Sequence, residues 1–335
     1  MNSSNRKTGG VLITGGSGFV GPHLIRHLKP HAPRISVFAP RTVASDDSSV
    51  EYHSVDIRDR KSVSSLMEEI SPSSIYHLAG VSAVDVAWSN PRFTYDVNVT
   101  GTYNVFEAAM RLSLLPKLLN VSTGQVYAAS QGALTESSLV CPDNPYAASK
   151  AMAELLAVQY RNRTSGGIIT ARSFNHTGPG QSPNFFFSAV AKQFVEIEHD
   201  RRPPTLLVGD IHVKRDFTDV RDIVRAYFLL VEKGRVGEVY NVCSGRAICL
   251  ADVVELFAAK TGIRVSIEQD PKKVRMSDVR EISGDPRKLR DETGWLPVIS
   301  LEQSVQDILA YWRSQYGKPV EPVAASLRKE SVSYS

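Results

Sequence analysis

A tyrosine and a lysine four residues apart form the pair in this sequence best suited to proton transfer. Tyr146 and Lys150 lie in the run NPYAASK at residues 144–150, where an asparagine N-cap and a proline predict the start of a helix. Because residues i and i+4 share one helix face, the ammonium favours ionisation of a phenol whose ordinary pKa is about 10. The spacing is typical of a tuned proton donor.

Two hydroxyl residues precede this pair in the run NVSTGQVY at residues 120–127. The run ends a predicted buried strand, and open α/β sheets bind their ligands at the carboxyl ends of their strands. Ser122 and Thr123 could each bond a reacting oxygen there and stabilise the charge that develops on it. The residue types alone leave the choice between them open.

Three glycines, Gly15, Gly18 and Gly21, separate a predicted strand at residues 11–14 from an amphipathic helix. The first glycine permits a tight turn, the second lets the backbone approach a pyrophosphate, and the third allows the helix to pack closely on the strand. Because strand, turn and helix follow in this order, the pattern favours dinucleotide binding over a plain turn.

The end of the second predicted strand, at residues 35–39, indicates which dinucleotide is bound. NAD-binding units carry an acidic residue there, whereas this sequence has Arg41, whose guanidinium suits a 2'-phosphate. We therefore expect NADP(H), with NAD(H) the alternative if Arg41 is a solvated loop charge. Asp56, which precedes Ile57 after the third strand, is placed for the adenine edge, although it could instead cap the next helix.

Strands and helices alternate along the first half of the chain, which predicts an α/β fold. A Rossmann-type doubly wound parallel sheet, covered by helices on both faces, is the architecture that fits this alternation. The expected strands span residues 11–14, 35–39, 52–55, 75–79, 117–122 and 167–174, and the expected helices span 62–70, 91–112 and a segment from 145.

A second module is expected from residue 175, where glycine and proline become frequent. A buried run at 239–242 again resembles a sheet strand, so the two modules are interleaved. We expect a cofactor domain at 9–174, to which 214–245 returns. A smaller C-terminal α/β substrate domain follows from 175–213 and 246–320, and 321–335 form a flexible tail.

Composition excludes several classes of protein. A chain of 335 residues, 22% charged and 42% hydrophobic with a formal charge of +4, is typical of a globular protein of about two domains. Dense Lys/Arg stripes are missing, which argues against a nucleic-acid partner. No run reaches the ~20 apolar residues of a membrane span, and no secretion signal is apparent, so we expect a cytoplasmic protein.

Metal and disulfide chemistry are not expected either. The three cysteines lack CxxC spacing, and the eight histidines lack patterns such as HExxH. His77, which ends a predicted buried strand, is expected to be a hydrogen-bonded core residue.

Three motifs resemble those of the extended short-chain dehydrogenase/reductase family over roughly residues 10 to 315: TGGSGFVG at 14–21, HLAG at 77–80 and YAASK at 146–150. The resemblance implies an NAD(P)-dependent enzyme with the catalytic residues Thr123, Tyr146 and Lys150, and so favours Thr123 over Ser122. It also implies a homodimer formed through the helices at about 91–112 and 145–162.

The same resemblance implies a set of cofactor-binding residues. These are Gly15, Ser17, Gly18, Phe19, Val20, Arg41, Asp56, Ile57, Leu78, Ala79, Gly80, Tyr146, Lys150, Phe174 and His176.

Within the family, the segments 175–181, 215–222 and 239–245 most resemble GDP-6-deoxy-4-keto-mannose reductases, which are relatives of GDP-mannose 4,6-dehydratases. This implies a GDP-sugar substrate that contacts Ser82, Gln125, Asn175, Lys192, Arg215, Arg275 and Asp278. Dehydratases carry a glutamate two residues after the catalytic threonine. Here Gln125 occupies that position, and an amide cannot act as a general base.

The sequence therefore predicts NADPH-dependent reduction of the C4 keto group of a GDP-4-keto-6-deoxy-mannose type sugar, as in GDP-D-rhamnose synthesis, with the proton supplied by Tyr146. The alternatives are a GDP-mannose 4,6-dehydratase or another nucleotide-sugar dehydratase or 4-epimerase. A cofactor-sensing scaffold without catalysis is the alternative outside enzymes.

Overall fold

The fold is built on a parallel sheet whose strand order reverses in the middle. The computed structural model describes residues 10–41, 43, 47–130, 132–163, 167–271 and 279–316. Seven strands pair in parallel in the order β10-β6-β5-β4-β1-β2-β3. They are β1 (Val11–Thr14), β2 (Ile35–Ala39), β3 (Val50–Ser54), β4 (Ser74–His77), β5 (Lys117–Thr123), β6 (Ile168–Ser173) and β10 (Val239–Val242). This confirms the expected Rossmann-type sheet.

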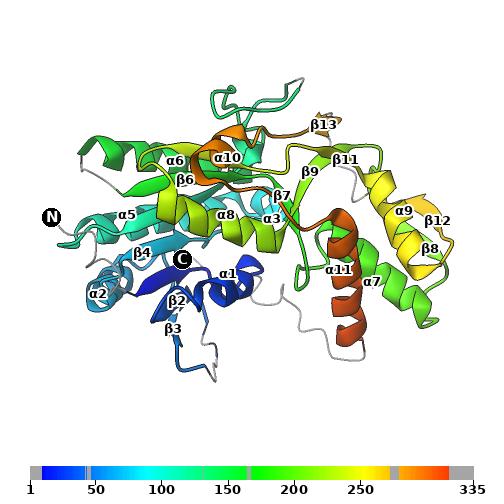
Figure 1. The fold of residues 1–335 in the computed structure, drawn as a ribbon, viewed down its shortest axis with the longest axis horizontal. Helices are drawn as coiled ribbons and strands as arrows, with labels where there is room; N and C mark the ends of the chain where they lie inside the picture. Colours follow the sequence, from blue (N-terminus) through cyan, green and yellow to red (C-terminus); the bar gives the residue numbers. More distant parts are fainter. Residues whose placement is uncertain are drawn as a thin grey trace, which may run out of the picture.

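Helices cover both faces of this sheet (Figure 1). They are α1 (Val20–Leu28), α2 (Arg60–Ile70), α3 (Val84–Ser89), α4 (Pro91–Tyr95), α5 (Thr102–Met110), α6 (Pro145–Arg163), α8 (Val220–Lys233) and α10 (Arg287–Thr293). Because successive strand residues point to opposite faces, Ile13 packs in a core with α1 and α8, whereas Leu12 packs in another with α2 and α5. The strands are therefore buried on both sides, as parallel sheets require.

The helix expected at 91–112 is not continuous. It consists of α4, a π-helical turn η2 (Asp96–Gly101) and α5, which ends at Met110. Asn98 lies inside the π-helical turn, and its amide bonds both backbone groups of Val81, while a Cβ on Gly101 would lie 2.5 Å from Ile57. Such π-helical turns are frequent at functional sites because they re-aim one side chain.

The second region lies at one end of the large sheet (right side of Figure 1). Its four-stranded sheet has β9 (Lys214–Asp219) paired with β7 (Asn175–Thr177), β11 (Ala247–Cys249) and β13 (Glu281–Ile282), and a separate parallel pair joins β8 (Thr205–Val208) to β12 (Ser266–Gln269). Helices α7 (Phe186–Glu198), α9 (Leu250–Thr261) and α11 (Leu301–Gln315) share a hydrophobic core with these strands.

Two stretches are placed differently from the expectation. Of residues 214–245, β9 belongs to the second region, where it pairs with three strands, and only α8 and β10 return to the large sheet. Conversely, Leu289 of α10 and the following Trp295 lie in the core of the large-sheet region, although they were expected in the substrate domain. Short-range patterns predict elements, but long-range pairing decides which sheet each element joins.

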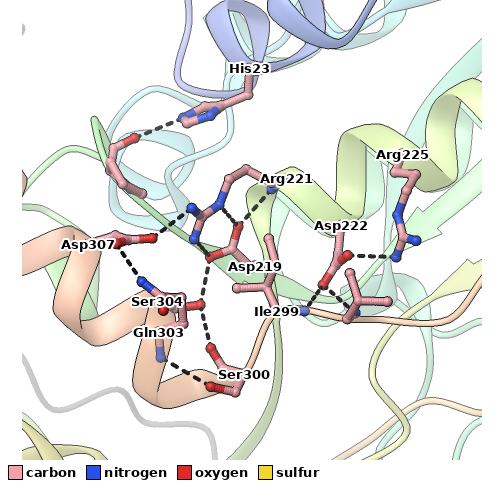
Figure 2. A network of polar contacts seen from close by, with 12 residues as sticks. His23, Asp219, Arg221, Asp222, Arg225, Ile299, Ser300, Gln303, Ser304 and Asp307 are labelled. Atoms are coloured by element: carbon pink, nitrogen blue, oxygen red, sulfur yellow. Dashed lines mark hydrogen bonds and ion pairs between the residues drawn. The ribbon is translucent and has the colours of Figure 1, made fainter.

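A polar network holds the two regions together where β9 passes into α8. Figure 2 shows Arg221 between Asp219 of β9 and Asp307 of α11, with N–O distances of 2.8 and 2.6 Å. The hydroxyl of Ser304 on α11 also donates to Asp219. Nearby, His23 of α1 bonds the carbonyl of Pro179 in the loop after β7 at 2.9 Å, a second polar contact between the two regions.

Among the described residues no helix is both long and apolar enough to cross a membrane. The same residues contain no group of three or more His, Cys, Asp or Glu side chains that could hold a metal ion.

Candidate active site

The glycine turn between β1 and α1 leaves room for a ligand on its outer side. Gly15 has φ +71°, and a Cβ there would lie 2.6 Å from the backbone of Ala79, while a Cβ on Gly21 would lie 1.9 Å from the carbonyl of Gly16. Only glycine fits at these two positions. A Cβ on Gly18 would meet one protein atom within 4 Å, the Gly15 oxygen at 3.3 Å, so its outer face is open.

The residues after β4 lie beside this turn. The amide of Leu78 donates to the Thr14 carbonyl at 3.0 Å, and the amide of Ala79 to the Thr14 hydroxyl at 3.3 Å. His77 is bonded by Thr14 at 2.7 Å and Thr102 at 2.9 Å, and burial lowers its pKa to about 3. His77 is therefore a neutral, hydrogen-bonded core residue, as expected.

Tyr146 lies at the first turn of α6, beside the end of β5. The Asn144 side chain accepts from the Ala147 amide at 2.9 Å and so caps the helix. The phenol is buried, and burial raises its pKa, while the side chain of Thr123 lowers it by hydrogen bonding. The phenol is therefore protonated at neutral pH, and the hydroxyl that reaches it is that of Thr123.

Lys150 is fixed between the ends of β4 and β5. Its Nζ donates to the Val121 carbonyl at 2.8 Å, and burial lowers its pKa to about 8, against an opposing effect of Glu154. A Cβ on Gly80 would lie 3.3 Å from this Nζ and 3.0 Å from the Asn98 oxygen. Gly80 thus lies directly against the ammonium end of Lys150.

Asn98 connects the loop after β4 to the catalytic helix, a role that the sequence patterns did not reveal. Its side chain accepts from the Val81 amide at 2.7 Å and donates to the Val81 carbonyl at 3.0 Å and to the Ser149 hydroxyl at 2.9 Å. Ser149 in turn donates to the Tyr146 carbonyl at 2.7 Å. No spacing rule marks Asn98, because the π-helical turn that aims it depends on tertiary packing.

The structure separates the two candidate hydroxyls. Ser122 donates to the carboxylate of Glu154, which forms a buried ion pair with Arg172 at 2.7 Å. Ser122 is therefore engaged away from the phenol. Glu154 and Arg172 were not predicted as site residues, although Glu154 repeats the four-residue spacing of Tyr146 and Lys150.

The predicted cofactor residues gather along the carboxyl ends of β1 to β4. Ser17 and Arg41 are exposed, and Phe19 and Val20 are half-buried. Asp56 binds the Arg58 guanidinium at 3.0 Å and accepts from its backbone amide at 2.9 Å.

The alternative role of Asp56 as a helix cap is wrong. The side chain that caps α2 is that of Asp59, which accepts from the Lys61 amide. Asp56 accepts instead from Arg58, in the turn that precedes the helix.

Phe174 and His176 lie where the chain leaves the large sheet. The ring of Phe174 packs against Gly124 and Gly284, each of which would clash with it if it carried a Cβ. His176 bonds the Phe174 carbonyl at 3.0 Å and stacks on Phe19 with ring centroids 6.0 Å apart. This stack links the glycine turn to the first strand of the second region.

Some predicted substrate residues lie close to these groups. Gln125 follows Thr123 by two residues and accepts from Asn144 at 3.5 Å. Ser82 is exposed two residues after Gly80, and Asn175 is half-buried at the start of β7.

Arg215 lies on β9 and donates to the carbonyls of Lys214 at 2.8 Å and Arg280 at 3.4 Å. Arg275 and Asp278 lie outside the described residues.

Lys192 is not brought to the catalytic side chains. It pairs with Glu196 at 3.8 Å and lies 5.8 Å from the Trp312 ring centroid, in an open hollow of about 760 Å³ between α7, β8 and α11. No catalytic residue lines this hollow. The face of α7 that carries Phe187, Ala191 and Phe194 is buried in the core, which leaves Lys192 toward α11.

A doubly wound parallel sheet with a glycine turn after β1 and a Thr–Tyr–Lys set at the ends of β5 and α6 defines an extended short-chain dehydrogenase/reductase. The sequence pattern of the GDP-mannose 4,6-dehydratase family matches residues 12–308, so the chain belongs to this family of NAD(P)-dependent enzymes.

Individual relatives agree with this assignment. The chain is 36% identical over 309 residues to GDP-6-deoxy-D-mannose reductase of Pseudomonas aeruginosa, which covers 91% of this chain and 97% of that protein. It is 30% identical over 286 residues to GDP-6-deoxy-D-talose 4-dehydrogenase of Aggregatibacter actinomycetemcomitans, covering 85% and 91% respectively. The structure of RMD from Pseudomonas aeruginosa complexed with NADPH superposes with a TM-score of 0.81 at 34% identity, covering 91% and 99% of the two chains.

Proposed function

We propose that this enzyme reduces the C4 keto group of a GDP-4-keto-6-deoxy-mannose type sugar to a hydroxyl with NADPH, which forms GDP-D-rhamnose. The observation that carries this proposal is the buried Tyr146 phenol at the first turn of α6, with Thr123 at the end of β5 and Lys150 one helical turn away, all three side chains being buried. Similarity to the Pseudomonas aeruginosa reductase supports the same reaction.

The residues present fit a dinucleotide. The open outer face of Gly18 lets backbone amides approach a pyrophosphate, and α1 begins at Val20, just after the turn. Arg41, exposed directly after β2, would meet a 2'-phosphate with its guanidinium, which favours NADP(H) over NAD(H). When bound, this cofactor supplies the hydride that C4 receives.

The chain's own residues handle the proton and the charge. Tyr146 donates its phenolic proton to the C4 oxygen as C4 becomes tetrahedral, and the ammonium of Lys150 stabilises the resulting phenolate. Thr123 orients the carbonyl through its hydroxyl and shares the developing negative charge. Because all three side chains are buried, these interactions act with little screening by water.

Gln125 argues against dehydration. A dehydratase must remove a proton from the carbon beside the keto group, and an amide cannot accept it as a general base. In this structure the Gln125 oxygen accepts from Asn144, the residue that caps the catalytic helix. Its position suits binding of a sugar hydroxyl better than proton abstraction.

For the nucleotide end, we propose a grip from the second region. Arg215 on β9 and Asn175 on β7 lie on neighbouring strands of the four-stranded sheet. A guanidinium fork suits the oxygens of a diphosphate. Arg275 and Asp278 are proposed to complete this grip, as in the related reductases.

We further propose that the enzyme is a homodimer formed through residues 91–112 and 145–162. Leu155 and Val158 on α6 are 65% and 50% exposed, and Trp88 on α3 is 61% exposed. Apolar side chains gathered on one helical face are typical of a subunit interface. Replacing Leu155 and Val158 by Glu should yield monomers in light scattering, and an unchanged mass would contradict the dimer.

A cytoplasmic location is also proposed. Cys141, Cys243 and Cys249 are all free thiols. Free thiols are typical of reducing compartments.

The reaction is tested by incubating the enzyme with NADPH and GDP-4-keto-6-deoxymannose while nicotinamide absorbance is followed. We expect cofactor oxidation with formation of one 4-hydroxy sugar, and loss of both in Tyr146→Phe. Equal rates in the two proteins would refute the proposal, and turnover of a GDP-sugar without net NADPH oxidation would indicate an epimerase or dehydratase. Thermal shifts with GDP-, dTDP- and UDP-sugars identify the nucleotide, because a bound ligand stabilises the fold.

A further inference from the structure

One buried carboxylate on the catalytic helix has no part in the mechanism above. Glu154 follows Lys150 by four residues, as Lys150 follows Tyr146, so the three side chains lie along one face of α6. Glu154 is 8% exposed. Burying a charged side chain is unfavourable unless other groups pair with it and donate hydrogen bonds to it.

Two neighbouring strands hold this carboxylate in place. Ser122, next to the catalytic Thr123 on β5, donates its hydroxyl to Oε1. Arg172 on β6 donates from Nε to both oxygens at 3.1 Å and from Nη2 to Oε2 at 2.7 Å. The guanidinium itself lies 4.7 Å from the centroid of the Tyr127 ring and donates to the Glu136 carbonyl at 3.2 Å. The carboxylate is therefore paired on both oxygens and confined to one position.

Among the ionisable groups around Lys150, Glu154 is the one that favours the charged form of the amine. His77 on β4 is neutral, Tyr146 is protonated, and Arg172 is paired with Glu154. Burial lowers the pKa of Lys150 to about 8, and the carboxylate of Glu154 opposes this shift.

Acidic groups on the other elements packed against α6 are directed elsewhere. Asp85 on α3 and Asp96 in η2 are exposed, and Glu107 on α5 pairs with Arg60 and Arg111. The neutral groups that contact Nζ, such as the Val121 carbonyl, bond it without adding charge.

We propose that Glu154 is a positioning residue for catalysis: its buried charge keeps Lys150 an ammonium, and its bonds to Ser122 and Arg172 hold α6 against the ends of β5 and β6. This inference rests on the role of Lys150 in the proposed function. The carboxylate acts on the reaction only through the lysine.

The decisive variant is Glu154→Gln, which keeps the size of the side chain and removes its charge. Lys150 then loses its proton more readily, so the decline of kcat/KM at alkaline pH should move about one unit toward lower pH. NADPH affinity, measured by fluorescence titration across the same pH range, should decline in parallel, because Lys150 is also one of the predicted cofactor-binding residues. If ionisation of the Tyr146 phenol set the alkaline decline of kcat/KM, loss of the ammonium would move that decline to higher pH. Such a shift would overturn the proposal.

Two further variants separate charge from stability. Glu154→Asp retains the charge and should stay close to the wild-type pH profile. Asp222→Asn removes another buried helical carboxylate, which pairs with Arg225 and accepts from the amides of Val298 and Ile299 (Figure 2). This variant should lower thermal stability and leave the pH profile unchanged. A Glu154→Gln profile that also stays unchanged while stability falls would show a purely structural role and overturn the proposal.

If Glu154→Gln does not fold, the double variant Glu154→Leu with Arg172→Met replaces the ion pair by apolar side chains, an exchange that buried pairs often tolerate. Its pH profile should move in the same direction, and an unmoved profile would overturn the proposal. If the wild-type enzyme binds NADPH but reduces no keto sugar, the proposed function fails, while the pH dependence of NADPH binding still tests Glu154.

Discussion

The large-sheet region and the second region hold their polar groups in different ways. Around the catalytic helix, Ser122, Glu154 and Arg172 are buried and bonded to one another. In the second region, all four residues of β12 are exposed, and the Arg215 guanidinium is bonded to the carbonyls of Lys214 and Arg280. The polar groups around α6 are therefore fixed by one another, whereas those of β12 face solvent.

The physical reason is the cost of burying charge. A buried ion pair must be well matched, because an unpartnered charge in a low-dielectric core is strongly destabilising. An exposed pair, such as Arg313 with Glu198 on the second region, is solvated and contributes little. Electrostatic preorganisation thus suits buried groups such as those around α6 more than exposed ones such as Arg313.

The strongest test of this contrast removes the proton donor. Tyr146→Phe should lower kcat by about 10²- to 10⁴-fold, the usual contribution of a general acid, with little change in NADPH affinity. Steady-state kinetics and fluorescence titration measure the two quantities. Tyr311→Phe, on α11 in the second region, is the matched control and should remain fully active.

A second test compares two ion pairs for stability. Arg172→Met leaves Glu154 buried without its charged partner and should lower the free energy of unfolding by about 3–5 kcal/mol. Arg313→Met breaks the exposed pair and should cost less than about 1 kcal/mol. Denaturant unfolding measures both changes. Equal losses in the free energy of unfolding would contradict the difference between the buried and the exposed pair.

The third test uses the pH dependence of stability. Lys150 has a folded pKa of about 8 against an ordinary 10.5, so between these values the folded protein has released a proton that the unfolded chain retains. Stability therefore rises with pH across this interval. Lys150→Met removes that slope and should be about 3 kcal/mol more stable than wild type at neutral pH, with the difference vanishing near the upper value.

This pH test has a control on the other region. Lys260→Met, at an exposed position of α9, should show the wild-type slope. Denaturant unfolding at a series of pH values gives the slopes, and equal slopes for wild type and Lys150→Met would contradict the burial cost of the ammonium.

The smallest effect is expected at an exposed position of the large-sheet region. Arg41→Ala should raise the KM for NADPH about tenfold and leave that for NADH nearly unchanged, because a charge-assisted bond to the 2'-phosphate is lost. Arg34→Ala, at the opposite end of β2, is the control. Equal changes with both cofactors would show that Arg41 does not select the dinucleotide.

Local patterns predicted much of the catalytic region. The glycine turn, the order of strands and the Tyr146–Lys150 pair depend on residues close in sequence, and the parallel sheet follows from their alternation. Only the structure separates Thr123 from Ser122, because the two neighbouring hydroxyls point to opposite faces of the strand and that of Ser122 is bonded to Glu154.

Local patterns do not place an element whose neighbours are distant in sequence. The apolar face of α7 leaves Lys192 toward α11, away from Tyr146, and its contact with the substrate stays a prediction. The segment 214–219 was expected in the large sheet, and its pairing with β7, β11 and β13 places it in the second region. Nothing local in either segment specifies its partner.

The sequence by itself determined the turn that can accept a pyrophosphate and the tyrosine and lysine one helical turn apart, because backbone freedom at glycine and helical periodicity act over a few residues. Only the tertiary structure decided that Glu154 meets Arg172 and Ser122, and that Asn98 reaches the loop after β4. Those contacts join strands and helices that are up to tens of residues apart, and burial in one shared core is what brings them together.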